Sequence, residues 1–229
     1  MLLLYVEAGG VLAIARSTTC RGLLAIVALL YPAWLSAQTT PARTAAASAG
    51  PSWSFVFTGD VYLVPDSPSF ASPVLTADRG WLHLEARYNY EDRGTASFWF
   101  GCNFSVGQRL TLEVTPMIAA VVGTTAGVAP GYQIALSYGR LSLSDTGEYV
   151  FNLNDRTASF FYAWPQAAYS LSDWLKVGIA AQRTKVYHTD FDIQRGALVG
   201  FVVGPVELTS YVFAGKPSPT VVLEGVVRF

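Results

Sequence analysis

The nine residues WLHLEARYN, residues 81–89, alternate between apolar and polar side chains. The even positions carry the apolar residues Leu82, Leu84, Ala86 and Tyr88. The odd positions are mostly polar and include His83, Glu85, Arg87 and Asn89. Successive side chains of an extended chain point to opposite faces of the sheet. This stretch therefore predicts a β-strand with one apolar face and one polar face.

The same alternation recurs over much of the chain that follows. It is clear in residues 97–104, 110–115 and 132–138. From Trp53 onward the sequence has neither a long period of 3.6 residues nor 18 consecutive apolar residues, so it does not predict membrane-spanning helices. We therefore expect an all-β fold.

Alternation alone does not distinguish an exported soluble lipid-binding β-barrel from a barrel in a membrane. Only 14% of the residues are charged, against about 25% in a typical soluble domain. Several predicted strands are about ten residues long, as in transmembrane barrels. These features favour a transmembrane antiparallel up-and-down β-barrel over residues 53–229. The net charge of −1 provides no basic field for nucleic acid.

The first 52 residues read as export and linker sequence. Arg16 and Arg21 precede an apolar run at residues 23–30, and small residues follow before Gln38. This order is typical of a secretory signal peptide. We predict a signal peptide at residues 1–37 and a flexible leader at residues 38–52. Export followed by a barrel predicts the bacterial outer membrane, reached through the inner membrane.

The turns allow the strands to be counted backward from Phe229. Short and long connections alternate, as expected for a barrel with short periplasmic turns and longer outer loops. An even number is reached with twelve strands, and ten is the alternative because Pro73 weakens the strand at residues 70–77. Asp145 falls on the apolar parity of its strand, which predicts a bulge or a register error there.

The polar parity predicts which charged residues line the lumen. These are Glu85, Arg87, Glu113, Glu148, Lys176, Glu207, Glu224 and Arg228. Opposite charges in a narrow lumen are expected to pair, which would give a closed interior. The excess of acids instead favours a narrow channel with a mild cation preference. Both interpretations remain open from the sequence.

Two features concern the membrane surface near the outer ends of the strands. Arg183 and Lys185 fall on the lipid-facing parity, where they could contact lipopolysaccharide phosphates. Tyr88, Tyr90 and Tyr187 fall there too, as expected for an aromatic girdle. Trp81 and Trp174 follow inner turns and join an inner girdle only if the strand ends twist.

The final strand, VVLEGVVRF at residues 221–229, resembles the closing strand of bacterial outer-membrane β-barrel proteins. In that superfamily a terminal aromatic residue after alternating apolar residues is the assembly signal. The resemblance implies that Leu223, Val227 and Phe229 form this signal. It also implies that outer-membrane lipids, lipopolysaccharide and the outer-membrane insertion machinery are partners.

Little in the sequence points to catalysis. His83 and His188 fall at opposite ends of their strands, so we expect no shared metal site, and no cofactor motif is present. His188 and Asp190 in an outer loop leave an enzyme with a rim site as an alternative. We expect a narrow channel or a structural, porin-like protein, with the oligomeric state undetermined.

Overall fold

The structure is a computed structural model that describes residues 51–229 except 66, 187–191 and 216–217. The predicted signal peptide and almost all of the predicted leader lie outside these residues. No helix within the described part is both long and apolar enough to cross a membrane. The elements are β1 (Ser54–Leu63), β2 (Phe70–Arg79), β3 (Leu82–Tyr88), β4 (Thr95–Cys102), β5 (Phe104–Val106), β6 (Leu110–Gly123), β7 (Gly127–Tyr138), β8 (Leu141–Asn152), the 3-10 helix η1 (Arg156–Ala158), β9 (Phe160–Ser170), β10 (Leu175–Val186), β11 (Asp192–Val203), β12 (Val206–Phe213) and β13 (Thr220–Arg228).

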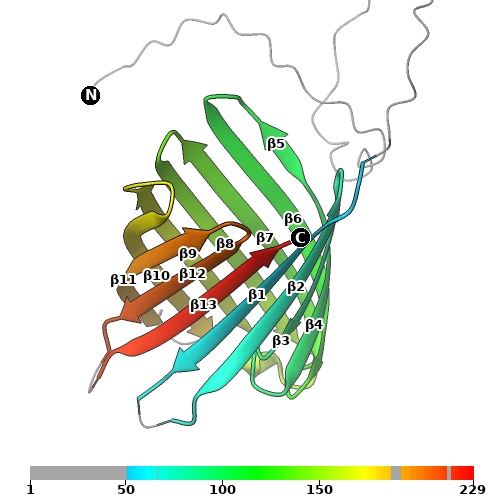
Figure 1. Ribbon diagram of the computed structural model, residues 1–229. Coiled ribbons are helices and arrows are strands. Elements are labelled where there is room, and N and C mark those ends of the chain that lie inside the picture. Colours follow the sequence, from blue (N-terminus) through cyan, green and yellow to red (C-terminus); the bar gives the residue numbers. More distant parts are fainter. Residues whose placement is uncertain (1–50, 66, 187–191, 216–217) are drawn as a thin grey trace, which may run out of the picture. The chain divides into compact units, whose positions relative to one another are not determined.

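The strands close into an antiparallel barrel, with β13 paired to β1 (Figure 1). On the other side β4 pairs with β6, and β5 pairs with β6 in the same register. Strands β4 and β5 are therefore one strand interrupted at Asn103. The predicted count of twelve is confirmed. The strand containing Pro73 also forms, with Pro73 opposite Gly59 of β1.

The connections at the two ends of the barrel differ in length. Residues 80–81, 139–140 and 204–205 make two-residue turns at the end that carries the C-terminus, which we call the inner end. Gly139 and Gly204 have φ of 59°, a conformation that glycine adopts without strain. Residues 89–94, 153–159 and 214–219 make longer connections at the opposite, outer end.

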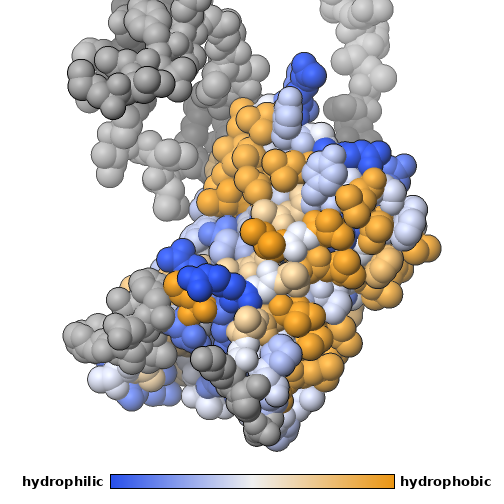
Figure 2. Space-filling model, turned by 90° about the vertical axis from the view of Figure 1, so that its left-hand side faces the viewer, coloured by the Kyte–Doolittle hydropathy of each residue, from blue (hydrophilic) through white to orange (hydrophobic). Residues whose placement is uncertain are grey.

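The apolar face of each strand points away from the barrel interior. On β4, Phe98 is 61% exposed while its neighbour Ser97 is fully buried. Ile179 on β10 is 66% exposed. Hydrophobic side chains accordingly spread over the outside of the wall (Figure 2). A soluble barrel would bury these groups, so this surface is suited to lipid.

The aromatic girdle differs in part from the prediction. Tyr88 is exposed on the outside, and Trp174 also turns outward and stacks on Phe201. The prediction for Tyr90 was wrong, because its ring enters the lumen. Asn89 adopts φ of +56°, which ends the strand alternation just before Tyr90. Tyr187 lies outside the described residues.

The predicted bulge at Asp145 is wrong. Asp145 pairs with Ile134 on one side and Pro165 on the other, in registers that run unbroken through this position. Its carboxylate therefore faces outward. The Tyr132 hydroxyl donates a 2.9 Å hydrogen bond to Asp145 Oδ2. This bond supplies a polar partner on the lipid-facing wall.

Candidate functional site in the lumen

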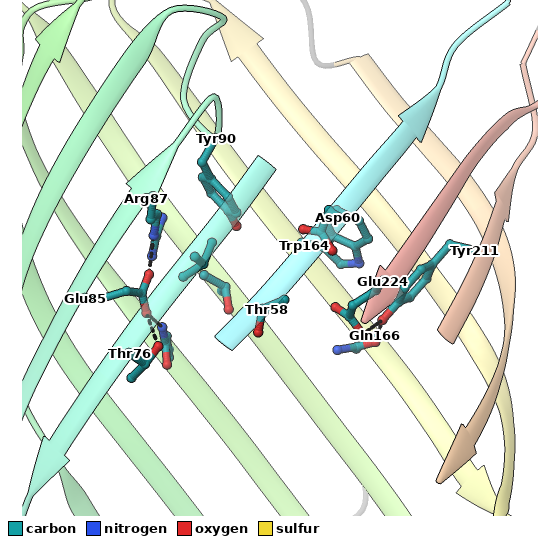
Figure 3. A pocket seen from close by; sticks show the side chains of 13 residues that line it. Thr58, Asp60, Thr76, Glu85, Arg87, Tyr90, Trp164, Gln166, Tyr211 and Glu224 are labelled. Carbon is teal, nitrogen blue, oxygen red and sulfur yellow. Dashed lines mark hydrogen bonds and ion pairs between the residues drawn. The ribbon is translucent and has the colours of Figure 1, made fainter. Parts of the chain in front are cut away.

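Two cavities occupy the barrel interior. The inner cavity has a volume of about 690 Å³ and reaches Gly80 and Arg228 at the inner end. The central cavity has a volume of about 230 Å³ and lies deeper in the barrel (Figure 3). Both are lined by Thr76, Gln133 and Thr146, so they adjoin one another. Together they form a polar passage from the inner end to the middle of the lumen.

One side of the central cavity is formed by the Arg87 cluster, which comprises Arg87, Glu85, Glu148, Tyr90 and Trp99. Arg87 is only 4% exposed, and its guanidinium lies 4.3 Å from the centroids of both aromatic rings. Its Nε donates to Glu85, and its Nη1 donates to Glu148 Oε2 at 2.7 Å. Three strands separate β3 from β8, so the bond between Arg87 and Glu148 crosses the lumen. The cluster thus pairs its charges within the protein.

Aromatic side chains narrow the lumen near its outer end. This aromatic layer comprises Tyr62, Tyr90, Tyr162, Trp164 and Tyr211. The ring centroids of Tyr62 and Trp164 are 6.5 Å apart, although four strands separate β1 from β9 along the shorter way round the barrel. Tyr90 and Tyr162 meet across the lumen in the same way, at 5.8 Å. The layer is therefore the constriction of the lumen.

The other side of the central cavity carries two carboxylates. Asp60 on β1 is the cross-strand partner of Glu224 on β13, and both line the cavity (Figure 3). Glu224 accepts a 3.1 Å hydrogen bond from the Tyr211 hydroxyl. Asp60 is 5% exposed, and among the described residues its Oδ1 has no hydrogen-bond partner. This side therefore holds two carboxyl groups that take part in no ion pair among the described residues.

A third group of charges lies at the inner end. Lys176 Nζ contacts Glu207, and Arg228 Nη2 lies 3.3 Å from Glu207 Oε2. The Arg228 side chain is 55% exposed. Nearby, the Nδ1 atom of His83 lies 2.8 Å from Asp78 Oδ1. Most charges of this rim are thus paired, but they remain closer to solvent than those of the Arg87 cluster.

Solved structures with a similar fold include outer-membrane porins. The KdgM porin aligns with a TM-score of 0.53 and 10% identity over 77% of this chain and 99% of that chain, as does KdgM porin in complex with disordered oligogalacturonate. Omp33 from Acinetobacter baumannii aligns with a TM-score of 0.47 and 10% identity over 79% of this chain and 100% of that chain. No protein-family model and no curated protein matches the chain.

The similarity to KdgM porin shows the fold, and the apolar side chains on the outside of the wall show that this surface is suited to lipid. The chain has the fold of a transmembrane β-barrel. This barrel has twelve strands and a lumen that is polar over its inner half.

The eight charged residues assigned to the lumen of the barrel fall into four places. The Arg87 cluster contains Glu85, Arg87 and Glu148. The inner rim contains Lys176, Glu207 and Arg228. Glu224 lies opposite Asp60, and Glu113 lines the inner cavity.

The remaining predicted residues lie on the outside of the barrel or outside the residues that the structure describes. Arg183 is exposed on β10, whereas the Lys185 side chain and the candidate enzyme residues His188 and Asp190 lie outside what the structure describes. Phe229 stacks on Phe55 and exchanges two backbone hydrogen bonds with it. The other two residues of the predicted assembly signal, Leu223 and Val227, are on β13 beside it.

Sequence reasoning missed Asp60, Tyr90 and Trp164 as lumen residues. Asp60 had a usable signal, because Thr58, Asp60 and Tyr62 share one parity while apolar residues occupy the other. Tyr90 had none, since its orientation follows from the backbone at Asn89.

Proposed function

We propose that the barrel is a narrow outer-membrane channel for small polar solutes, with a preference for cations. The observation that carries the proposal is the polar passage formed by the inner and central cavities. Five carboxylates and two arginines line it. The acids are Asp60, Asp78, Glu85, Glu113 and Glu224, and the bases are Arg87 and Arg228. Acidic side chains in a pore favour cations.

The constriction sets the expected size of the solute. The aromatic layer and the bond between Arg87 and Glu148 bridge the lumen on the outer side of the central cavity. A twelve-strand barrel is also narrower than the 16-strand porins with open aqueous channels. We therefore expect passage of ions and small molecules and exclusion of folded or bulky solutes.

The comparison with KdgM porin bears on charge. One KdgM structure is a complex with oligogalacturonate, a polymer of a sugar acid. The lining of the present lumen carries mainly the same sign of charge as that ligand, so it is suited to solutes of the opposite sign. We do not transfer the KdgM ligand to this chain.

Planar bilayer recording of the full-length protein tests the proposal. Under a gradient of potassium chloride, we expect a small stepwise conductance and a reversal potential of the sign that indicates cation preference. Trp164→Ala should increase the conductance, because it removes one half of the bridge to Tyr62. Absence of conductance in both proteins, or a preference for chloride, would contradict the proposal.

We also propose that Arg183 and Lys185 bind lipopolysaccharide phosphates. The outward exposure of Arg183 near the outer end of β10 supports the proposal. The double variant R183Q/K185Q should copurify with less lipopolysaccharide than the parent protein, and an unchanged amount would argue against the contact.

A further inference from the structure

We propose that Asp60 and Glu224, together with Trp164, bind a small ammonium compound that carries a hydroxyl group. The proposal rests on the channel function and names the class of solute that the lumen recognises. The site lies in the central cavity, which all three side chains line (Figure 3).

The two carboxyl groups of the site lie on neighbouring strands of the barrel wall. Asp60 and Glu224 are direct cross-strand partners, and like charges in that arrangement repel one another. Glu224 accepts a hydrogen bond from the hydroxyl of Tyr211, which is uncharged. Among the described residues, Asp60 takes part in no ion pair. A bound cation would remove the repulsion.

The other buried acids of the lumen differ in this respect. Glu85 and Glu148 share Arg87, and Glu207 contacts both Lys176 and Arg228. Arg87 also lines the central cavity, but its guanidinium is already bonded to two carboxylates and covered by two rings. The wall of the barrel therefore offers no free cation to Asp60 within its described part.

Asp60 is almost completely buried. Its exposed fraction is 5%, and its Oδ1 has no hydrogen-bond partner among the described residues. A buried carboxylate without a hydrogen bond or counter-charge is strongly unfavourable, whereas a cation placed beside it stabilises the charge. The unpartnered oxygen is itself enclosed, but Asp60 lines the cavity, so a ligand in the cavity would lie beside its carboxyl group.

The remaining lining indicates which cation would fit. Trp164, Tyr211 and Tyr90 contribute aromatic surface, which attracts organic ammonium groups. The Nε1–H of Trp164 has no acceptor among the described residues. An indole N–H only donates, so its partner must be an acceptor such as a hydroxyl oxygen. No group of three or more described His, Cys, Asp or Glu side chains could hold a metal ion.

Size restricts the ligand further. The central cavity, at about 230 Å³, is smaller than the pockets of about 300–1,000 Å³ that hold drug-sized molecules. A short amino alcohol meets all the requirements: its ammonium group for the two carboxylates, its carbon chain for the rings and its hydroxyl for Trp164. Such a molecule would enter through the adjoining inner cavity.

Isothermal titration of the full-length protein in detergent micelles tests the site without requiring conduction. Ethanolamine is the probe, and ethylene glycol, which lacks the ammonium group, is the negative control. We expect saturable binding of ethanolamine with a dissociation constant of about 1 mM, and weakening by roughly tenfold or more in Asp60→Asn. Asp173→Asn, which removes the same charge from an exposed inner turn, should bind as the parent does.

Two further comparisons test the chemistry of the site. Ethylamine should bind more weakly than ethanolamine to the parent protein, and Trp164→Phe should remove most of that difference. A folded barrel migrates differently before and after heating on a detergent gel. If Asp60→Asn lacks this difference, it has not folded, and Glu224→Gln repeats the charge test in its place.

The site proposal is overturned if ethanolamine does not bind, if it binds Asp60→Asn as tightly as the parent, or if potassium at equal concentration displaces it completely. Binding without any conductance in bilayers would leave the site in place and contradict the channel. Conductance without binding would do the reverse.

Discussion

Both sides of the central cavity carry carboxyl groups, but only one side pairs them with an arginine. On the side of β3 and β8, Arg87 is enclosed by two carboxylates and two aromatic rings. On the side of β1 and β13, Asp60 and Glu224 face one another, and neither takes part in an ion pair within the described wall. The first side pairs its carboxylates with Arg87, although Glu148 Oε1 has no hydrogen-bond partner among the described residues, whereas Asp60 and Glu224 on the second side take part in no ion pair there.

This difference separates charges that hold the barrel together from charges available to a solute. The bond between Arg87 and Glu148 joins two strands that three others separate, so its loss affects the fold. The carboxylates of Asp60 and Glu224 repel one another, so neutralising either one removes this repulsion between the two strands. The predictions below test this distinction, from the largest expected effect to the smallest.

Arg87→Met should destabilise the barrel most. The substitution leaves Glu85 and Glu148 buried without their cation, and breaking a buried ion pair in this way costs about 3–5 kcal/mol. The midpoint of urea unfolding in lipid vesicles measures the effect. Arg228→Met, which removes a half-exposed arginine from the inner rim, is the control and should shift the midpoint far less. Equal shifts for the two variants would remove the distinction.

Asp60→Asn should act in the opposite direction. It removes a buried charge that has no described partner, so we expect unchanged or increased stability, by up to about 1 kcal/mol. Glu85→Gln, at a paired position, should destabilise the barrel in the same unfolding assay. In bilayers, Asp60→Asn should also reduce the preference for cations. A large loss of stability in Asp60→Asn would show that its carboxylate has a structural partner after all.

Tyr90→Ala should affect conduction more than stability. The ring lies against Arg87 on one side and meets Tyr162 across the lumen on the other. Its removal should widen the constriction and increase single-channel conductance by about twofold, since conduction depends on pore diameter. Tyr88→Ala, two residues earlier in the chain and facing lipid, provides the matched control. A similar conductance for both variants would place the constriction elsewhere.

Deletion of Phe229 should have the smallest effect on the lumen. The residue lies on the outside, where it stacks on Phe55 and completes the pairing of β13 with β1. We expect less protein inserted into the outer membrane of cells, because the predicted assembly signal is incomplete. Molecules that do insert should conduct as the parent does. Normal insertion of the shortened chain would contradict the assigned role of Phe229.

The sequence was sufficient for the barrel because strand alternation is a local property. The parity of residues 81–89 distinguished Leu84 from Glu85, and the structure places the first on the lipid side and the second in the lumen. Counting turns from Phe229 also predicted the strand number correctly, despite Pro73. Each step needed only neighbours along the chain.

Contacts across the lumen could not be predicted in this way. The partners Arg87 and Glu148 are 61 residues apart, and their meeting depends on how far round the barrel each strand lies. Asp145 misled us for a different reason. Its unbroken register and the Tyr132 hydroxyl show that a lone carboxylate can stay on the lipid-facing parity when a neighbouring strand supplies a donor.

The bond between Arg87 and Glu148 has a consequence for how such a barrel could change in size. Duplication of one hairpin would add two strands and enlarge the circumference, since barrel diameter grows with strand number. The two side chains would then no longer reach one another at 2.7 Å, and neither would Tyr62 and Trp164. A wider descendant would lose its constriction, and Glu148 would lose its bond to Arg87 and need a new partner, while Glu85, on the same strand as Arg87, would keep its own.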